Sequence, residues 1–202
     1  FDALAGDEST PLYHQLIDSK TRAIDTGATD LWTSVSSDEG NPVFLGLDGV
    51  RADKLDHATV AQVRGIVLAE LDHLAKLPAG DPELVAFDRA VQARIVDLRR
   101  RLDKFLDTPP GFGFRGTGSD WIQALHQLDK QPGFKKELTK RAELAELEAM
   151  LNGTTNPWTS LIHQWGLDQT PYGVASKPSV ARRQQLDAGR KARIDAELAR
   201  LQ

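Results

Sequence analysis

Apolar residues recur at intervals of three and four along the stretch from Asp81 to Leu106. Their positions are Leu84, Phe87, Val91, Ile95, Leu98, Leu102 and Phe105. That spacing places them on one face of a helix about 39 Å long. Asp81 suits the N-cap, Pro82 suits the first helical position, and Pro109 with Pro110 ends the helix. We therefore predict one long amphipathic helix, whose charged side faces solvent or a polar cavity.

A similar apolar stripe precedes this helix in the sequence. It consists of Val60, Val63, Val67, Leu71 and Leu74. The stripe predicts a second helix that begins at Asp53 or Asp56 and ends at Leu77. Because only a short Pro-Ala-Gly connection separates the two helices, we expect them to lie antiparallel and side by side.

The first residues of the chain indicate a loop that leads into a short helix. Ser9 or Thr10 can cap this helix, and Pro11 can occupy its first turn. We expect three of its residues to face inward, namely Leu12, Leu16 and Ile17.

A strand-like alternation of side chains between two faces appears in two neighbouring segments, 29–37 and 42–50, with turn residues at 38–41. This arrangement predicts an antiparallel hairpin. Two strands alone are marginally stable, so the hairpin needs at least one more partner strand. Residues 172–176 also alternate and are a candidate for a further strand.

The second half of the chain is mostly helical in pattern. Helices are predicted near 119–129, over 134–151 and from 157 to 165. The last segment, 180–202, has only a thin apolar stripe, formed by Leu186, Ile194, Leu198 and Leu201. Such a stripe indicates a helix that leaves the domain and needs a partner.

Together these elements predict an α+β fold. We expect a small, mainly antiparallel sheet backed on one face by the long helices, with the Asp81–Leu106 helix covering that face. The expected division is one α+β domain at 1–178 and an outgoing linker helix at 179–202.

Composition narrows the class of protein. A net charge of −4 argues against a nucleic-acid partner, and the absence of an apolar run near 18 residues argues against a membrane span. The sequence contains no cysteine, which excludes disulfides and thiolate chemistry. The chain starts at Phe1 without a signal-like segment, so we expect a processed product or an excised piece.

Two short motifs could carry chemistry, and each has a plainer interpretation. Glu70 and His73 have a metal-ligand spacing, yet a histidine of this kind more often is solvated or packs between helices. Residues 111–116 fit G-x-G-x-x-G, but they follow a helix and two prolines instead of a strand. An aromatic loop facing a cavity is the favoured interpretation of this second motif.

The residues most suited to line a cavity are therefore Phe112, Phe114 and Arg115 of this loop. Arg99 and Arg100 of the long helix are further candidates for contact with a substrate or partner, although an arginine run more often is a solvated face. No H-E-x-x-H or H-x-x-E-H motif occurs, so we assign no catalytic residue and no metal ligand.

Several phrases of the sequence resemble one family. They are DESTPLYHQLIDS, PVFLGLDGVRADKLDHATVAQVRGIVLAELDHLA, DPELVAFDRAVQARIVDLRR, TPPGFGFRGTGSDWIQAL and NPWTSLIHQWGLDQTPYGVASKPSVARRQQLD. In this order they resemble the pitrilysin/insulinase-type zinc metallopeptidases, in their presequence-protease-like branch. The resemblance extends over nearly the whole chain.

The resemblance implies the second, non-catalytic domain of the N-terminal half, followed by the start of the helical linker between the two halves. Such enzymes form two bowls that close around short peptides. Their zinc site belongs to the first domain, so the resemblance implies zinc in the parent enzyme and no cofactor in this chain. It also implies a strand before the first helix, which is missing here. The implied partners are the remaining domains of the same peptidase and its peptide substrate.

Two other functions remain open from the residues alone. One is an autonomous helical interaction or scaffold domain that holds partners with its long helix and its last helix. The other is an inactive peptidase homologue. A strand-poor helical bundle would favour the interaction domain, whereas a helix-backed antiparallel sheet with an unpaired edge would favour the peptidase domain.

Overall fold

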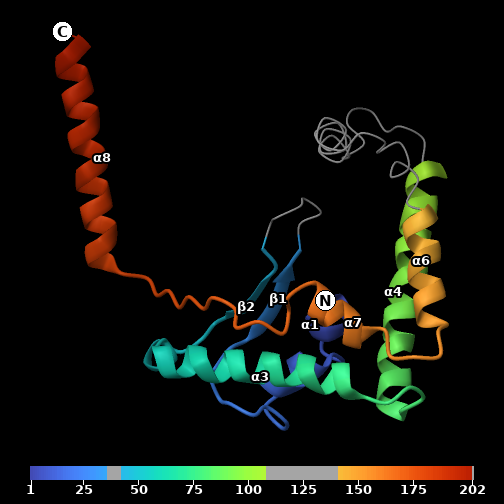
Figure 1. Cartoon of the computed structure of the whole chain (residues 1–202). Coiled ribbons are helices and arrows are strands. Elements are labelled where there is room, and N and C mark those ends of the chain that lie inside the picture. Colours follow the sequence, from blue (N-terminus) through green and yellow to red (C-terminus); the bar gives the residue numbers. More distant parts are fainter. Residues whose placement is uncertain (36–41, 108–140, 202) are drawn as a thin grey trace.

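The computed structural model describes residues 1–35, 42–107 and 141–201 (Figure 1). The described helices are α1 (Asp2–Ala5), α2 (Pro11–Leu16), α3 (His57–Lys76), α4 (Pro82–Asp107), α6 (Arg141–Leu151), α7 (Trp158–Gln164) and α8 (Val180–Leu201). A short 3-10 turn, Ala52–Lys54, precedes α3. The strands are β1 (Asp30–Ser34) and β2 (Phe44–Asp48). The described part of the chain is therefore α+β, as the sequence predicts.

The two strands form the predicted antiparallel hairpin, with Leu31 opposite Leu47 and Trp32 opposite Gly46. Leu31 is buried in the core, whereas Trp32 on the other face is 40% exposed. The indole of Trp32 lies directly over Gly46, where any Cβ atom would collide with it. One face of the hairpin is thus inside the molecule, and an aromatic side chain covers a glycine on the other.

The expected third strand is not formed within the described residues. Residues 172–176 have neither helix nor strand structure, and the side chains of Tyr172 and Val174 are fully or almost fully exposed. The prediction of a strand there is wrong. Alternating side chains indicate a segment that could form a strand. The strand forms only when the edge of another strand supplies hydrogen-bond partners for its backbone.

The predicted starts of two helices are confirmed. The Asp56 side chain accepts a hydrogen bond from the Thr59 amide at 2.7 Å and caps α3. Thr10 occupies the N-cap position of α2, before Pro11. The three apolar residues expected to face inward from the first predicted helix, Leu12, Leu16 and Ile17, are all buried. Two residues of the α3 stripe, Leu71 and Leu74, are buried as well.

Helix α1 lies in the segment that the sequence indicates as a loop. It is only four residues long, too short for a periodic pattern to reveal it. Its residues Ala3, Leu4 and Ala5 are nevertheless buried, and α1 contacts α2, β1 and α4. This short helix is the point at which the sheet and the long helix meet.

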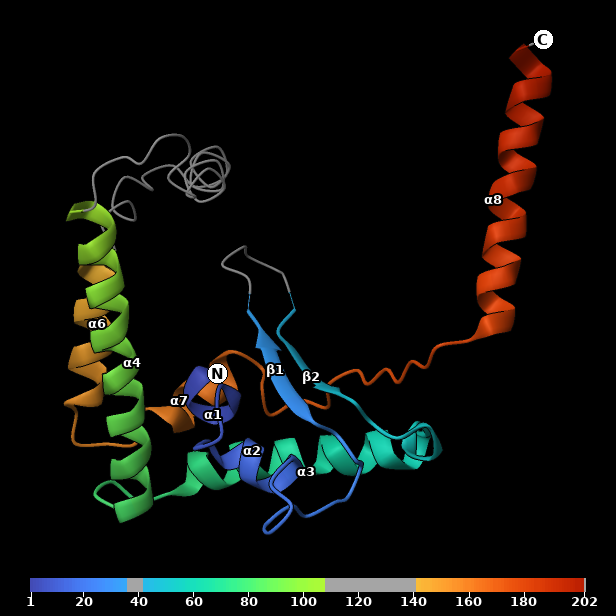
Figure 2. The ribbon, with the colours of Figure 1, turned by 180° about the vertical axis from the view of Figure 1, so that it is seen from behind.

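Helix α4 begins as predicted, with the Asp81 carboxylate accepting a hydrogen bond from the Glu83 amide at 2.8 Å. Its predicted position is wrong in two respects. It does not lie antiparallel along α3 but turns away from it, and it packs against α1 and α6 instead of covering the sheet (Figures 1 and 2). Gly80 has φ +82°, a conformation that lets the connection turn sharply.

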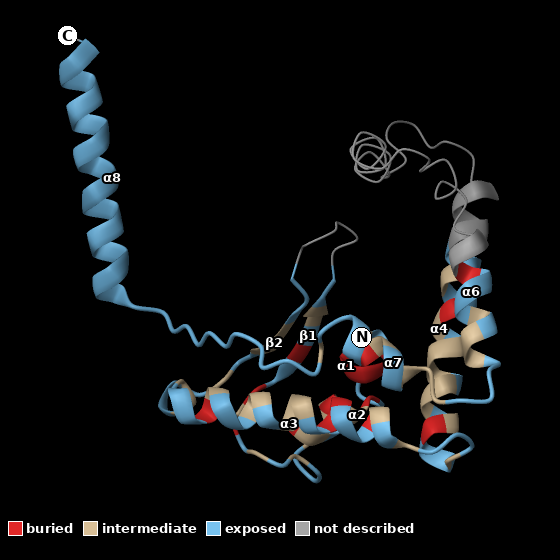
Figure 3. Ribbon diagram, in the orientation of Figure 1, coloured by how far each residue is buried: buried red, intermediate tan, exposed pale blue. Residues whose placement is uncertain are grey.

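The core lies where α1, α2, the inner face of the hairpin, α3, the start of α4 and α7 meet (Figure 3). Asn156 fixes two of these helices, because its side-chain amide donates to the carbonyl oxygens of Leu74 and Leu77 at 2.7 and 2.9 Å. Its side-chain oxygen accepts from the Trp158 amide at 2.9 Å. One residue therefore caps the end of α3 and the start of α7.

The other predicted helices have mixed outcomes. Helices α6 and α7 fall inside the predicted ranges 134–151 and 157–165, although residues 134–140 lie outside the described part of the chain. The segment 119–129 lies outside it as well.

Helix α8 forms at its predicted position and is exposed along its whole length. The division of the chain between residues 178 and 179 stays a prediction. No helix in the described ranges is long and apolar enough to cross a membrane.

Candidate functional site

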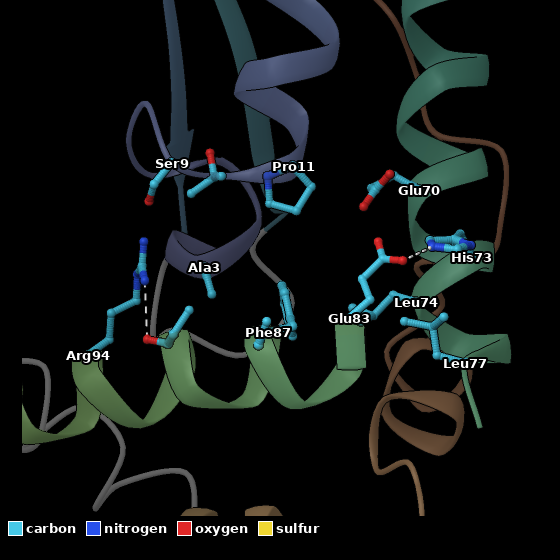
Figure 4. A pocket seen from close by; sticks show the side chains of 13 residues that line it. Ala3, Ser9, Pro11, Glu70, His73, Leu74, Leu77, Glu83, Phe87 and Arg94 are labelled. Atoms are coloured by element: carbon cyan, nitrogen blue, oxygen red, sulfur yellow. Dashed lines mark hydrogen bonds and ion pairs between the residues drawn. The ribbon is translucent and has the colours of Figure 1, made fainter. Parts of the chain in front are cut away.

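A cavity of about 180 Å³ lies between α1, the loop before α2, α3 and α4 (Figure 4). Its apolar part is formed by Ala3, Leu74, Leu77, Ala86, Phe87 and Ala90. Its polar part comprises Ser9, Thr10, Glu70, His73, Glu83 and Arg94. The cavity exists because α4 turns away from α3 after Gly80 and leaves a space that α1 only partly fills.

Glu70 is the buried acid of this cavity, with 8% of its surface exposed. Burial raises the pKa of its carboxyl group, because the charged form loses hydration. A hydrogen bond from the Gln15 side chain and the charge of His73 act in the opposite direction. The net result is a carboxyl group that holds its proton to a higher pH than usual.

His73 lies beside Glu70 and is directed toward α4. Its Nε2 atom is 3.0 Å from a carboxylate oxygen of Glu83, and both side chains are about half exposed. The hydrogen bond to Glu83 is the main cause that raises the pKa of His73. The pair therefore joins the last turn of α3 to the first turn of α4.

A second ion pair closes the opposite end of the cavity. The Arg94 guanidinium is 2.7 Å from a carboxylate oxygen of Asp7. Hydrogen bonds from Ser9, and then the charge of Arg94, lower the pKa of the Asp7 carboxyl group. This contact spans 87 residues of sequence and fixes the loop before α2 against α4.

The metal-ligand spacing of Glu70 and His73 does not gather further ligands in the part of the chain that the structure describes. No group of three or more histidine, aspartate or glutamate side chains there could hold a metal ion. The nitrogen of His73 that faces the cavity is engaged by Glu83. The cavity therefore combines a carboxyl group of raised pKa with a partly apolar lining.

The residues predicted from the sequence as cavity contacts lie elsewhere. Arg99 pairs with Glu148 at 2.9 Å and joins α4 to α6, and Arg100 is exposed. Neither lines the cavity described above. Phe112, Phe114 and Arg115 lie outside the described residues. Contact of any of the five with a chamber in a larger protein stays a prediction.

Of the polar residues at the cavity, the sequence singled out only Glu70 and His73, for their spacing, and it did not reveal their contacts. Asp7 and Arg94, like Gln15 and Glu70, are polar residues far apart in the chain, and nothing in their local sequence marks them as partners. The cap at Asp81 gave a further signal, because it placed Glu83 in the first turn of α4.

Comparison with known proteins gives no relative. No family model matches the sequence, and no curated protein and no solved structure is significantly similar to it.

Proposed function

We propose that this chain is a non-catalytic, chamber-forming part of a zinc-dependent peptidase that degrades peptides. The observation that carries the proposal is the hairpin of β1 and β2. One face of it is buried against helices, while the other face exposes Trp32 and Phe44. Within the described residues the hairpin has no further strand on either side. A domain that contributes a wall to a larger sheet and cavity has this architecture.

The resemblance of the sequence phrases to the pitrilysin/insulinase-type enzymes supplies the chemistry of the proposal. In that arrangement zinc is held by another domain, and this chain holds none of the ligands. Its own contribution is mechanical. The pairs Arg94–Asp7 and Arg99–Glu148 link α4 to the loop before α2 and to α6, and so help to position this wall.

A zinc titration tests the non-catalytic role directly. Calorimetry of the chain with zinc alone should show no stoichiometric, high-affinity site, since no H-x-x-E-H motif is present to supply ligands. Fluorogenic peptides incubated with the chain should remain intact. Tight zinc binding, or hydrolysis that persists with a chelator, would contradict the proposed role.

The parent activity needs a second experiment. The coding sequence on either side of this segment should encode H-x-x-E-H, and the full product should cleave peptides in a metal-dependent manner. Deleting residues 1–178 from that product should abolish the cleavage while leaving its zinc content unchanged. A parent that lacks the motif would instead be an inactive peptidase homologue serving as a scaffold.

The second candidate function is an autonomous interaction domain, and the exposure of α8 favours it. Every residue of α8 is exposed, including the three leucines and one isoleucine of its apolar stripe. The two functions differ in a measurable way. An interaction domain functions without a peptidase domain in the same protein, so a coding sequence with neither H-x-x-E-H nor a related domain would favour it.

A further inference from the structure

Exposed large apolar side chains gather in two places within the described residues. The first is the hairpin, where Trp32 and Phe44 lie on the outer face and the exposed Val35 and Val43 flank the strand ends. The second is the segment 170–201, here called the arm. Its exposed apolar residues are Tyr172, Val174, Val180, Leu186, Ile194, Leu198 and Leu201. Only three other large apolar residues in the described ranges are exposed, so most of the exposed large apolar side chains lie in these two places.

We infer that the two surfaces bind each other between two copies of this chain, with α8 of each copy lying on the outer face of the other copy's hairpin. The exchange is reciprocal and gives a twofold-symmetric dimer. This inference goes beyond the proposed function and does not depend on it.

The shapes of the two surfaces fit a helix on a sheet. Leu186, Ile194, Leu198 and Leu201 fall on one stripe of α8, because their spacings of eight, four and three follow the helical repeat. On the hairpin, Trp32 and Phe44 project from the face opposite the core-facing Leu31 and Leu47. An amphipathic helix placed there buries its stripe on an aromatic surface.

Charge favours a copy of this chain over other occupants. The arm carries seven basic and three acidic residues, a net charge of +4, while the rest of the sequence has 18 basic and 26 acidic residues, a net charge of −8. Asp30 and Asp48 form an exposed pair on the same face of the hairpin as Trp32. A nucleic acid or an anionic membrane would attract the arm but repel the remainder of the chain. Two α8 helices would repel each other.

The direction of the arm favours a second copy over the chain's own hairpin. Gly173 of the arm packs closely against Val60 and Arg64 of α3. Beyond it, the proline at 178 restricts Lys177 to an extended backbone, which carries α8 outward. Both views of the molecule show α8 clear of β1 and β2 (Figures 1 and 2).

Sedimentation velocity of the 202-residue chain tests the inference. The chain should change from monomer to dimer as its concentration rises, and raising the salt from about 0.05 M to about 0.5 M should weaken the dimer. The double variant Ile194→Glu with Leu198→Glu should raise the dissociation constant at least roughly tenfold, because it places two charges in an apolar contact. Since every residue of α8 is exposed and the helix lies clear of the body, this change should leave the monomer fold intact.

A matched control uses the opposite side of the same helix. Ala192→Glu with Ala199→Glu adds the same two charges to α8, away from the stripe, and should weaken the dimer much less than the stripe variant does. If both double variants weaken the dimer equally, charge alone governs association and the stripe contact is wrong.

Mixing two defective variants identifies the contact. Phe44→Glu should damage the hairpin surface, and Ile194→Glu with Leu198→Glu damages the arm. Each should be monomeric alone, yet a mixture should dimerise in part, because one intact arm can then meet one intact hairpin. Failure of the mixture to associate would overturn the exchange. So would a chain that stays monomeric at every concentration, or one that remains monomeric but binds anionic vesicles.

Discussion

Asn156 joins two helices with a single side chain. Its amide group donates to two carbonyl oxygens at the end of α3 and its oxygen accepts at the start of α7. Gly46 has an equally specific role at the hairpin, since the Trp32 indole occupies the space where a Cβ would lie. At the scale of residues, the stability of the fold therefore depends on small groups that complete or permit a contact.

Asn156→Ala should lower the free energy of unfolding by about 1–3 kcal/mol, since it leaves carbonyl groups at the end of α3 without partners. Urea unfolding monitored by circular dichroism measures the change. Asn152→Ala, at an exposed asparagine that follows α6, is the control and should have little effect. Equal losses in both variants would show that Asn156 is not a special cap.

Two glycine substitutions should have opposite signs. Gly46→Ala should destabilise the protein by about 1–3 kcal/mol because the Trp32 indole must move. Gly65→Ala lies in α3 with open space around it, and it should stabilise by about 0.5–1 kcal/mol through helix propensity. The same urea experiment compares them. A neutral Gly46→Ala would mean that Trp32 does not rest on this glycine.

The elements meet at the turn between α3 and α4. This turn carries Gly80 at positive φ, and the His73–Glu83 pair links the two helices across it. Helix α4 then packs on α1 and α6, while Phe87 meets Trp158 of α7 edge to face at 5.2 Å between ring centroids. Contacts on both sides of the turn thus set the direction of α4.

The His73–Glu83 pair should make stability fall modestly with rising pH. The folded-state pKa of His73 is raised above its ordinary value of 6.5, so the stabilisation is fully present below 6.5 and is lost as pH rises through the raised pKa. Because both side chains are about half exposed, we expect only a few tenths of a kcal/mol. Glu70 and Asp81 also face His73 and act in the same direction as Glu83.

An NMR titration of the His73 ring checks this. Glu83→Gln should lower the pKa of His73 toward 6.5, whereas Glu146→Gln, at an exposed glutamate on α6, should not change it. An unchanged pKa in Glu83→Gln would show that the two helices are not joined by this pair in solution.

The described part of the molecule consists of a folded body and the arm, which contributes no buried residue to it. All core residues precede residue 163, and residues 168–201 are exposed throughout. The residues that stabilise the fold and most of the residues proposed to form the dimer contact therefore lie in different parts of the chain. The body provides the fold, and the arm together with the outer face of the hairpin provides the contact surfaces.

Removal of residues 177–202 should leave the body as stable as before, within about 0.5 kcal/mol at concentrations where the chain is monomeric. The truncation keeps Gly173 and its contacts with Val60 and Arg64. Urea unfolding of the truncated and full chains makes the comparison. A loss well above that value would indicate that α8 docks on its own body.

The sequence alone determined the local elements. The periodic stripes fixed α3, α4 and α8, the aspartates at 56 and 81 fixed two helix starts, and alternation fixed the hairpin, because each of these signals arises within one segment. The tertiary structure decided the rest. It placed α4 against α1 and α6 instead of the sheet, left residues 172–176 without a strand partner, and brought Asp7 to Arg94 and Gln15 to Glu70. Those outcomes depend on which surfaces compete for burial, and that competition involves residues far apart in the sequence.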